Sequence, residues 1–327
     1  MRKIVVLLLL LVTLHAQDEY VFGEGVQVGV LPIYVGGYIS ADFQKKEGVT
    51  RYRLDDIAFL SYGNYEKFSY MVEFEFKDFY TYTDAHGDTS SETKSKLHTE
   101  RLYVDYTYDE NFAFRAGKYN SNIGFWNLLP INVLRETTSN PKSTYIVFPK
   151  FTSGLDSSYS SYLDGDLQVN ITLQHNESID DAYNNYNIDE HYAFGVAYAL
   201  DDYTVKLNGG YFHTYEQIKE KYYYFLLSGK YESEKYEILT EVGSQRSKGV
   251  FSTKYAGYIQ GSYRFTQEHI GVLRIESYDD VKQDDKDNIA IFGYTYRPLY
   301  PVALKAEYQF HQDDEDSELL FSLSVLF

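Results

Sequence analysis

The side chains with the most evident chemical potential are charged groups gathered around one long stretch near the middle of the chain. Five of them lie close together in sequence: Arg115, Lys118, Arg135, Glu136 and Lys142. Three more lie upstream: Glu73, Glu75 and Arg101. Guanidinium and ammonium groups bind carboxylates and phosphates, and rings of such charges select the ions that cross a narrow passage. What these groups do depends on the elements that position them.

Several segments alternate between apolar and polar residues. In Phe68–Lys77 the even positions are Phe or Tyr with one Val, while Glu73 and Glu75 occupy odd positions. Leu167–Gln174 and Val302–Phe310 show the same period of two. Successive side chains of a β-strand point to opposite faces, whereas a helix repeats every 3.6 residues. The pattern therefore predicts strands with one apolar and one polar face.

The composition favours a membrane barrel over a soluble sheet protein. The chain holds 36 Tyr, 21 Phe and no Cys, yet its mean hydropathy is only −0.42. In a transmembrane barrel, lipid-facing and lumen-facing residues alternate and aromatic residues gather at the membrane interfaces, which gives this combination. A net charge of −18 argues against nucleic acid as a partner.

Turn-forming and polar stretches set the number of strands. Seven short turns are predicted near residues 63–66, 109–111, 163–165, 201–202, 232–235, 266–267 and 298–301. Eight longer connections are predicted near residues 44–50, 83–96, 120–154, 176–190, 216–220, 246–252, 279–287 and 312–317. This alternation predicts a transmembrane antiparallel β-barrel of about sixteen strands, with short periplasmic turns and long extracellular loops. The alternation is interrupted at Asp56 and in Ser157–Tyr162.

The third long connection, at about residues 120–154, differs from a surface loop. It carries apolar residues that water would disfavour: Ile123, Phe125, Trp126, Leu128, Leu129, Ile131 and Val133. We expect it to fold inward against the barrel wall as a constriction loop. Two alternative roles are then open for its charged residues. They line the pore, or they anchor the loop to wall carboxylates such as Glu73 and Glu75.

The first residues are typical of a secretory signal. Met1-Arg2-Lys3 precedes an apolar run from Ile4 to Leu14 and a small residue at Ala16. We expect residues 1–16 to be a cleaved signal peptide and residues 17–327 to be the barrel domain. The apolar run is too short for a transmembrane helix, which needs roughly 20 residues.

Two features resemble known families. The last expected strand presents Leu319, Phe321, Leu323, Val325 and Phe327 on one face. This ending resembles the terminal signal of outer-membrane barrels. The enlarged third loop on a sixteen-stranded barrel resembles the general bacterial porins, and the stretch from Arg115 to Pro141 resembles the phosphate-selective porins O and P. The resemblance implies an outer-membrane pore for passive diffusion of small hydrophilic solutes and ions, with a homotrimer as a further implication.

Two other functions remain as alternatives. One is a substrate-specific channel, either for anions such as phosphate or for sugars, which tyrosines such as Tyr223 and Tyr258 would contact. The other is a barrel enzyme, which would need a nucleophile or base held by a partner. The histidines are scattered singly, and neither a G-x-S-x-G elbow nor an H-E-x-x-H pair is present. We therefore expect no enzyme, no cofactor and no metal site, since the acidic outer clusters lack the frame of a calcium loop.

Overall fold

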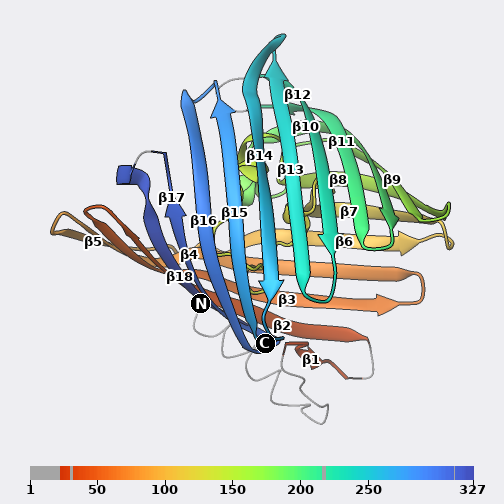
Figure 1. Cartoon of the computed structure of the whole chain (residues 1–327). Helices are drawn as coiled ribbons and strands as arrows, with labels where there is room; N and C mark the ends of the chain where they lie inside the picture. Colours follow the sequence, from red (N-terminus) through yellow and green to blue (C-terminus); the bar gives the residue numbers. More distant parts are fainter. Residues whose placement is uncertain (1–22, 30–31, 216–218, 313) are drawn as a thin grey trace.

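The barrel is built from one continuous antiparallel sheet. The computed structural model describes residues 23–29, 32–215, 219–312 and 314–327. Within these residues the sheet has eighteen strands, of which β1 (Val26–Gln27) and β5 (Asp88–Thr93) are short additions to β2 and β4. The other sixteen close into a ring, because β18 pairs with β2 (Figure 1). The expected signal peptide, residues 1–16, lies outside the described residues.

The sixteen barrel strands follow one another in chain order. They are β2 (Ile33–Lys46), β3 (Val49–Tyr65), β4 (Phe68–Ala85), β6 (His98–Thr107), β7 (Phe112–Asn120), β8 (Phe151–Tyr162), β9 (Asp166–His175), β10 (Ile188–Leu200), β11 (Tyr203–Thr214), β12 (Lys221–Glu232), β13 (Tyr236–Ser247), β14 (Val250–Arg264), β15 (His269–Asp280), β16 (Asp285–Leu299), β17 (Val302–Phe310) and β18 (Glu318–Leu326). The predicted sixteen strands and all seven short turns are confirmed. We call the end of the barrel with these turns the turn end, and the opposite end the loop end.

Two of the predicted long connections are two-residue turns, a third is largely paired strand, and the connection between β15 and β16 has four residues, 281–284. β2 and β3 are joined by a turn of two residues at Glu47 and Gly48, and β13 and β14 by Lys248 and Gly249. Gly48 and Gly249 both have positive φ, which glycine adopts readily and which such tight turns require. The third connection, between β4 and β6, consists largely of the β4–β5 hairpin, which projects from the barrel at the left of Figure 1. Strand pairing continues there beyond the point where the apolar alternation ends.

The interruption at Asp56 is a β-bulge. The register shifts between Leu54 and Asp56, so that Asp55 and Asp56 together lie opposite Ser40 of β2. A bulge bends the strand and re-aims its side chains. Here it buries both carboxylates on the inner face of the sheet. The other interrupted segment, Ser157–Tyr162, forms the second half of a regular strand, β8.

The two faces of the wall have opposite character. Outward-facing apolar side chains such as Phe194, Val205 and Ile275 are about half exposed, while the neighbouring inward residues Lys206 and Arg274 are buried. An apolar exterior with a polar interior is the reverse of a soluble protein and is typical of a transmembrane barrel. In the described part of the chain, the helices are all too short or too polar to span a membrane.

Candidate functional site: a loop held inside the barrel

The connection between β7 and β8, residues Ser121–Lys150, is called L3. It has only short helical turns, namely η1 (Trp126–Leu128), η2 (Asn132–Leu134) and α2 (Ser143–Ile146). Its first and last residues are adjacent, because the Ser121 N–H donates to the Lys150 carbonyl at 2.9 Å. The predicted range of 120–154 was slightly too long, since β8 already begins at Phe151.

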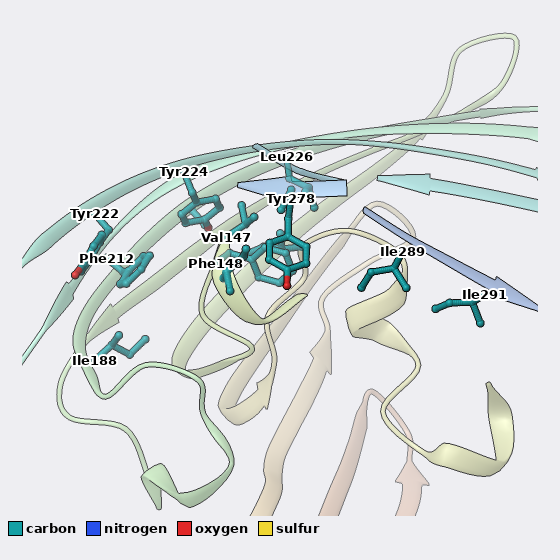
Figure 2. Close-up of a cluster of buried hydrophobic side chains, with 14 residues drawn as sticks. Val147, Phe148, Ile188, Phe212, Tyr222, Tyr224, Leu226, Tyr278, Ile289 and Ile291 are labelled. Atoms are coloured by element: carbon teal, nitrogen blue, oxygen red, sulfur yellow. The ribbon is translucent and has the colours of Figure 1, made fainter. Parts of the chain in front are cut away.

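The apolar side of L3 packs on inward-facing wall residues. Val147 and Phe148 lie under Tyr224, Leu226 and Tyr278, as Figure 2 shows. Elsewhere along L3, Trp126 packs with Leu239 and Tyr258, and Ile131 and Val133 pack with Tyr38, Ala58, Leu60 and Ala303. Burial of such a side chain contributes roughly 1.5–3 kcal/mol. Of the apolar residues of this connection, Ile123, Trp126, Ile131 and Val133 are buried, whereas Leu128 is exposed.

Three wall carboxylates bind the peptide N–H groups of L3. Glu241 on β13 accepts the N–H groups of Phe125 and Trp126 at 2.5 and 3.1 Å. Glu307 on β17 accepts those of Thr138 and Ser139 at 2.8 and 3.1 Å. Glu276 on β15 accepts that of Lys142 at 2.9 Å. Charge-assisted hydrogen bonds of this kind are about twice as strong as neutral ones.

Four wall bases bind carbonyl oxygens of the same loop. Their partners along L3 are Gly124 for Lys206, Ser139 for Arg274, Val133 and Arg135 for Arg297, and Asn132 and Thr137 for Lys305. Arg274 has no exposed surface and also pairs with Glu276 at 2.7 Å. Charged wall residues of both signs, on strands from β11 to β17, thus form hydrogen bonds with the backbone N–H and carbonyl groups of L3. An irregular segment buried in a barrel needs such partners.

A second loop also contributes to the site. Residues Asn176–Asn187, between β9 and β10, are called L4. The Asn185 side chain donates to the Tyr145 and Phe148 carbonyls and accepts from the Lys150 N–H, all at 2.8 Å. Tyr186 donates to the Ile146 carbonyl at 3.0 Å. L4 therefore holds the last part of L3 in place through hydrogen bonds. No pattern in the sequence predicted this contact between the two loops.

Asp180 fixes L4 to the loop ends of β6 and β7. Its carboxylate accepts the Thr99 N–H at 2.8 Å and lies 3.0 Å from Nδ1 of His98. Although partial burial acts to raise the pKa of Asp180, these hydrogen bonds outweigh it and lower that pKa below its usual value. Lys118 Nζ donates to the Asp180 and Thr99 carbonyls at 2.6 and 2.7 Å. Lys118 is fully buried in this contact.

The charged residues that the sequence places in L3 have different partners. Arg135 is buried and donates to the Leu129 and Pro130 carbonyls and to Asn140, so its contacts lie within L3. Glu136 pairs with Arg297 at 3.3 Å. Lys142 pairs with Asp285 at the loop end of β16, and its side chain is one-third exposed.

The wall residues predicted for the site form two groups. Glu73 and Glu75 on β4 and Arg101 on β6 lie together and are buried, with Arg101 paired to Glu73. Arg115 on β7 lies nearer the turn end, binds Asp105 at 2.6 and 2.9 Å, and stacks 4.0 Å above the Tyr103 ring. Its side chain is 37% exposed, so Arg115 is accessible from the interior.

The tyrosines that suggested a sugar track do not share a face. Tyr258 is buried under L3, whereas Tyr223 is 58% exposed on the outer face of β12. Tyr258 of β14 lies opposite Glu241 of β13. Because Glu241 points into the barrel, Tyr258 points inward as well. A track built from Tyr223 and Tyr258 is therefore wrong.

These features define a class of protein fold. A closed ring of sixteen antiparallel strands, apolar outside and charged inside, with a long loop held against the inner wall, is the barrel of the bacterial outer-membrane porins.

Solved structures share this fold over almost the whole chain. The outer-membrane channel DcaP of Acinetobacter baumannii matches with a TM-score of 0.59 and 10% identity, covering 93% of this chain and 100% of that one. An anion-selective porin from Comamonas acidovorans matches with a TM-score of 0.64 and 11% identity, covering 90% and 99%. The trimer form of OmpT of Vibrio cholerae matches with a TM-score of 0.59 and 11% identity, covering 90% and 99%. At these identities the likeness is one of fold. No protein-family model and no curated protein matches the chain.

Proposed function

We propose that this chain is a passive channel of the bacterial outer membrane, through which small hydrophilic solutes and ions diffuse, with L3 as its constriction. The observation that supports this most strongly is the placement of L3 inside a closed barrel. Seven charged wall residues, Lys206, Glu241, Arg274, Glu276, Arg297, Lys305 and Glu307, bind that loop. Barrels of sixteen strands are wide enough to leave an aqueous passage.

The surrounding membrane and the oligomeric state follow from other observations. The apolar exterior fits outer-membrane lipid as the surrounding phase. The trimer form of OmpT of Vibrio cholerae shares this fold, which favours a homotrimer here. We propose a channel rather than an enzyme, because the interior charges are used to hold loops in place. The resemblance of Arg115–Pro141 to the phosphate-selective porins finds no support in the three structures compared, so we propose no preference for phosphate.

Single-channel recording tests the channel. The purified, detergent-folded protein is expected to insert into a planar bilayer and to give discrete, ohmic current steps in simple salt. Native electrophoresis of the same sample gives its oligomeric state. A correctly folded barrel that conducts no current would contradict the proposal, and mainly helical circular dichroism would contradict the fold itself.

The accessible charges favour a local preference for anions. The side chains of Arg115, Lys142 and Lys77 are 37%, 34% and 45% exposed, and that of Asp285, the partner of Lys142, is 41% exposed. By contrast, Glu73 and Glu75 are buried in the wall. Ions in a passage respond most to the charges that they approach closely. We therefore propose a locally basic constriction inside an acidic chain, with Arg115 and Lys142 as its accessible members, since Arg135 is buried.

Charge reversal at these positions is expected to shift ion preference. The double variant Arg115→Glu, Lys142→Glu should move the reversal potential in a salt gradient toward cations, because the two exposed positive charges become negative. The matched control is Lys235→Glu at the turn between β12 and β13, which changes the same kind of charge far from L3. An unchanged reversal potential in the double variant would remove Arg115 and Lys142 from the filter.

A further inference from the structure

Four basic side chains gather on the outer face of the barrel, at the loop end of β12–β16. They are Lys221 on β12, Arg246 on β13, Lys254 on β14 and Lys286 on β16, and all four are exposed. Figure 1 shows these strands side by side, with their loop ends at the top. Because the whole chain has a net charge of −18, a positive surface of this kind needs an explanation. We call these four residues the basic rim.

The strand register fixes the direction of Lys221 and Arg246. Residues two apart on a strand share a face, and Lys221 lies two residues from Tyr223, which is on the outer face of β12. Arg246 is directly opposite Tyr223, and directly opposite residues also share a face. The Arg246 guanidinium lies 4.1 Å from the centre of the Phe251 ring. Both bases therefore point outward, and the Phe251 ring holds the guanidinium through a cation–π contact.

The other two bases flank one carboxylate. Lys286 is directly opposite Asp279 on β15, and Asp279 shares the outer face with Ile275. Lys254 is the residue left unpaired by the register shift between β14 and β15, and its Nζ lies 4.0 Å from Asp279 Oδ2. Among the described residues of β12–β16, Asp279 is the acid that faces outward at this end. The outer face here thus carries four positive charges against one negative charge.

Most of this positive charge has no partner within the chain. Lys221, Arg246 and Lys286 form no ion pair with any carboxylate of the residues that the structure describes. By contrast, Lys248, in the turn between β13 and β14, binds Glu220 at 3.0 Å. A base of this region is therefore paired where a carboxylate is within reach, and the counter-charge for the basic rim comes from outside the chain.

The basic rim lies at the edge of the apolar band. Below it, the outer face carries apolar and aromatic side chains that are about half exposed, namely Tyr223, Phe225, Ile259, Ile275 and Phe292. Aromatic residues such as Tyr223 mark the membrane interface of a transmembrane barrel. A strand rises about 3.3 Å per residue, so Lys221 stands roughly 7 Å beyond Tyr223, at the level of the lipid headgroups. Long basic side chains at this level extend their charge toward the headgroups while their stems pack on apolar surface.

We propose that the basic rim binds the phosphate group of an anionic membrane lipid, whose acyl chains lie along the apolar face below. Arg246 supplies the central contact, because a guanidinium presents paired N–H donors to a phosphate. Lys221 and Lys286 add positive charge on either side. A free phosphate ion would meet the same bases but none of the apolar face, so the two surfaces together favour a lipid. This binding goes beyond the proposed channel function, since it needs the folded barrel but not conduction.

Native mass spectrometry of the delipidated, detergent-folded barrel tests the site. The anionic probe is phosphatidylglycerol, and the comparison is phosphatidylcholine, whose choline group neutralises its phosphate. The wild type is expected to retain phosphatidylglycerol in preference. In the triple variant Lys221→Gln, Arg246→Gln, Lys286→Gln this preference should fall by at least about five-fold, the factor that one basic residue contributes near an anionic surface. Circular dichroism checks that the variant is folded, which we expect because the three side chains are exposed.

Two single variants sharpen this test. Asp279→Asn removes the acid that opposes the phosphate, so it should strengthen the retention of phosphatidylglycerol. Lys235→Gln, in the turn between β12 and β13 at the opposite end of the barrel, is the matched control and should leave retention unchanged. Equal retention of the two lipids by the wild type, or equal preference in the wild type and the triple variant, overturns the proposal.

Inorganic phosphate distinguishes a lipid from a free anion. An excess of phosphate should displace little phosphatidylglycerol, because the ion cannot contact the apolar face. Complete displacement would show a simple anion site and would overturn the assignment to a lipid. Lipid retention and conduction are measured separately. A barrel that retains phosphatidylglycerol through the basic rim and gives no current therefore contradicts the channel and supports the lipid site.

Discussion

Replacement of Arg274 by alanine is expected to destabilise the barrel by about 3–5 kcal/mol and to free the middle of L3. Arg274 has no exposed surface and holds Thr137 at 2.9 Å, Ser139 at 3.1 Å and Glu276 at 2.7 Å. Its removal leaves the buried Glu276 carboxylate without its basic partner and takes one donor each from the Thr137 hydroxyl and the Ser139 carbonyl. Urea unfolding of the lipid-reconstituted protein measures the loss of stability. Amide hydrogen exchange at Thr138 and Ser139 measures the freed loop.

Arg264→Ala is the matched control for this prediction. Arg264 also faces inward, but it lies near the turn end, is 28% exposed, and donates to the Ser233 carbonyl at 3.2 Å. We expect its removal to cost about 0–1 kcal/mol, because a partly solvated charge is screened by water. Equal losses for Arg264→Ala and Arg274→Ala would show that the contacts of Arg274 with L3 contribute little.

Excision of L3 is expected to raise single-channel conductance several-fold, since the loop occupies the barrel interior. The ends of L3 are already adjacent, and the Asn127 side chain binds both the Ser121 and Lys150 carbonyls. A flexible linker of about four Gly and Ser residues in place of residues 122–149 therefore spans the gap without moving β7 or β8. The wall charges that L3 covered then face water, which solvates them.

The control for excision is a shortened β4–β5 hairpin. Removal of residues 84–89 takes away the turn at His86 and Gly87 with the adjoining ends of β4 and β5, and it leaves L3 untouched. Its conductance is expected to match that of the wild type. If the L3 excision variant folds and also conducts like the wild type, the narrowest point lies elsewhere and the assignment of L3 as the constriction is wrong.

The alternation along the strands predicted which wall residues point inward, but it did not predict which groups of L3 those residues bind. Lys206, Glu241, Arg274 and Glu307 occupy the polar positions of their strands, and the structure places all four inward and buried. Sequence alone did not show that they bind the backbone of L3. That requires knowing which peptide groups an irregular loop presents, and these follow from its tertiary path rather than from its side chains.

The parts of the site that the sequence missed have weak local signals. L4 is a polar stretch whose Asn184, Asn185 and Tyr186 look like residues of any exposed loop. Only their contacts with the end of L3 and with Phe151, the first residue of β8, distinguish them. The two-residue turns at Gly48 and Gly249 were predicted as longer connections for a different reason. Strand pairing there continues through residues that are polar on both faces, so the hydrophobic period that marks a strand fades before the strand ends.

The closure of the ring has a consequence for how the chain reaches its native state. β2 and β18 are hydrogen-bonded neighbours from Tyr38 to Lys46, although nearly the whole chain separates them in sequence. Until they meet, each presents an unpaired strand edge that is prone to associate with other chains. Contacts between distant segments also form slowly. We expect assembly to be all-or-none and slow, with partly built sheets needing protection by a holding factor until both edges join.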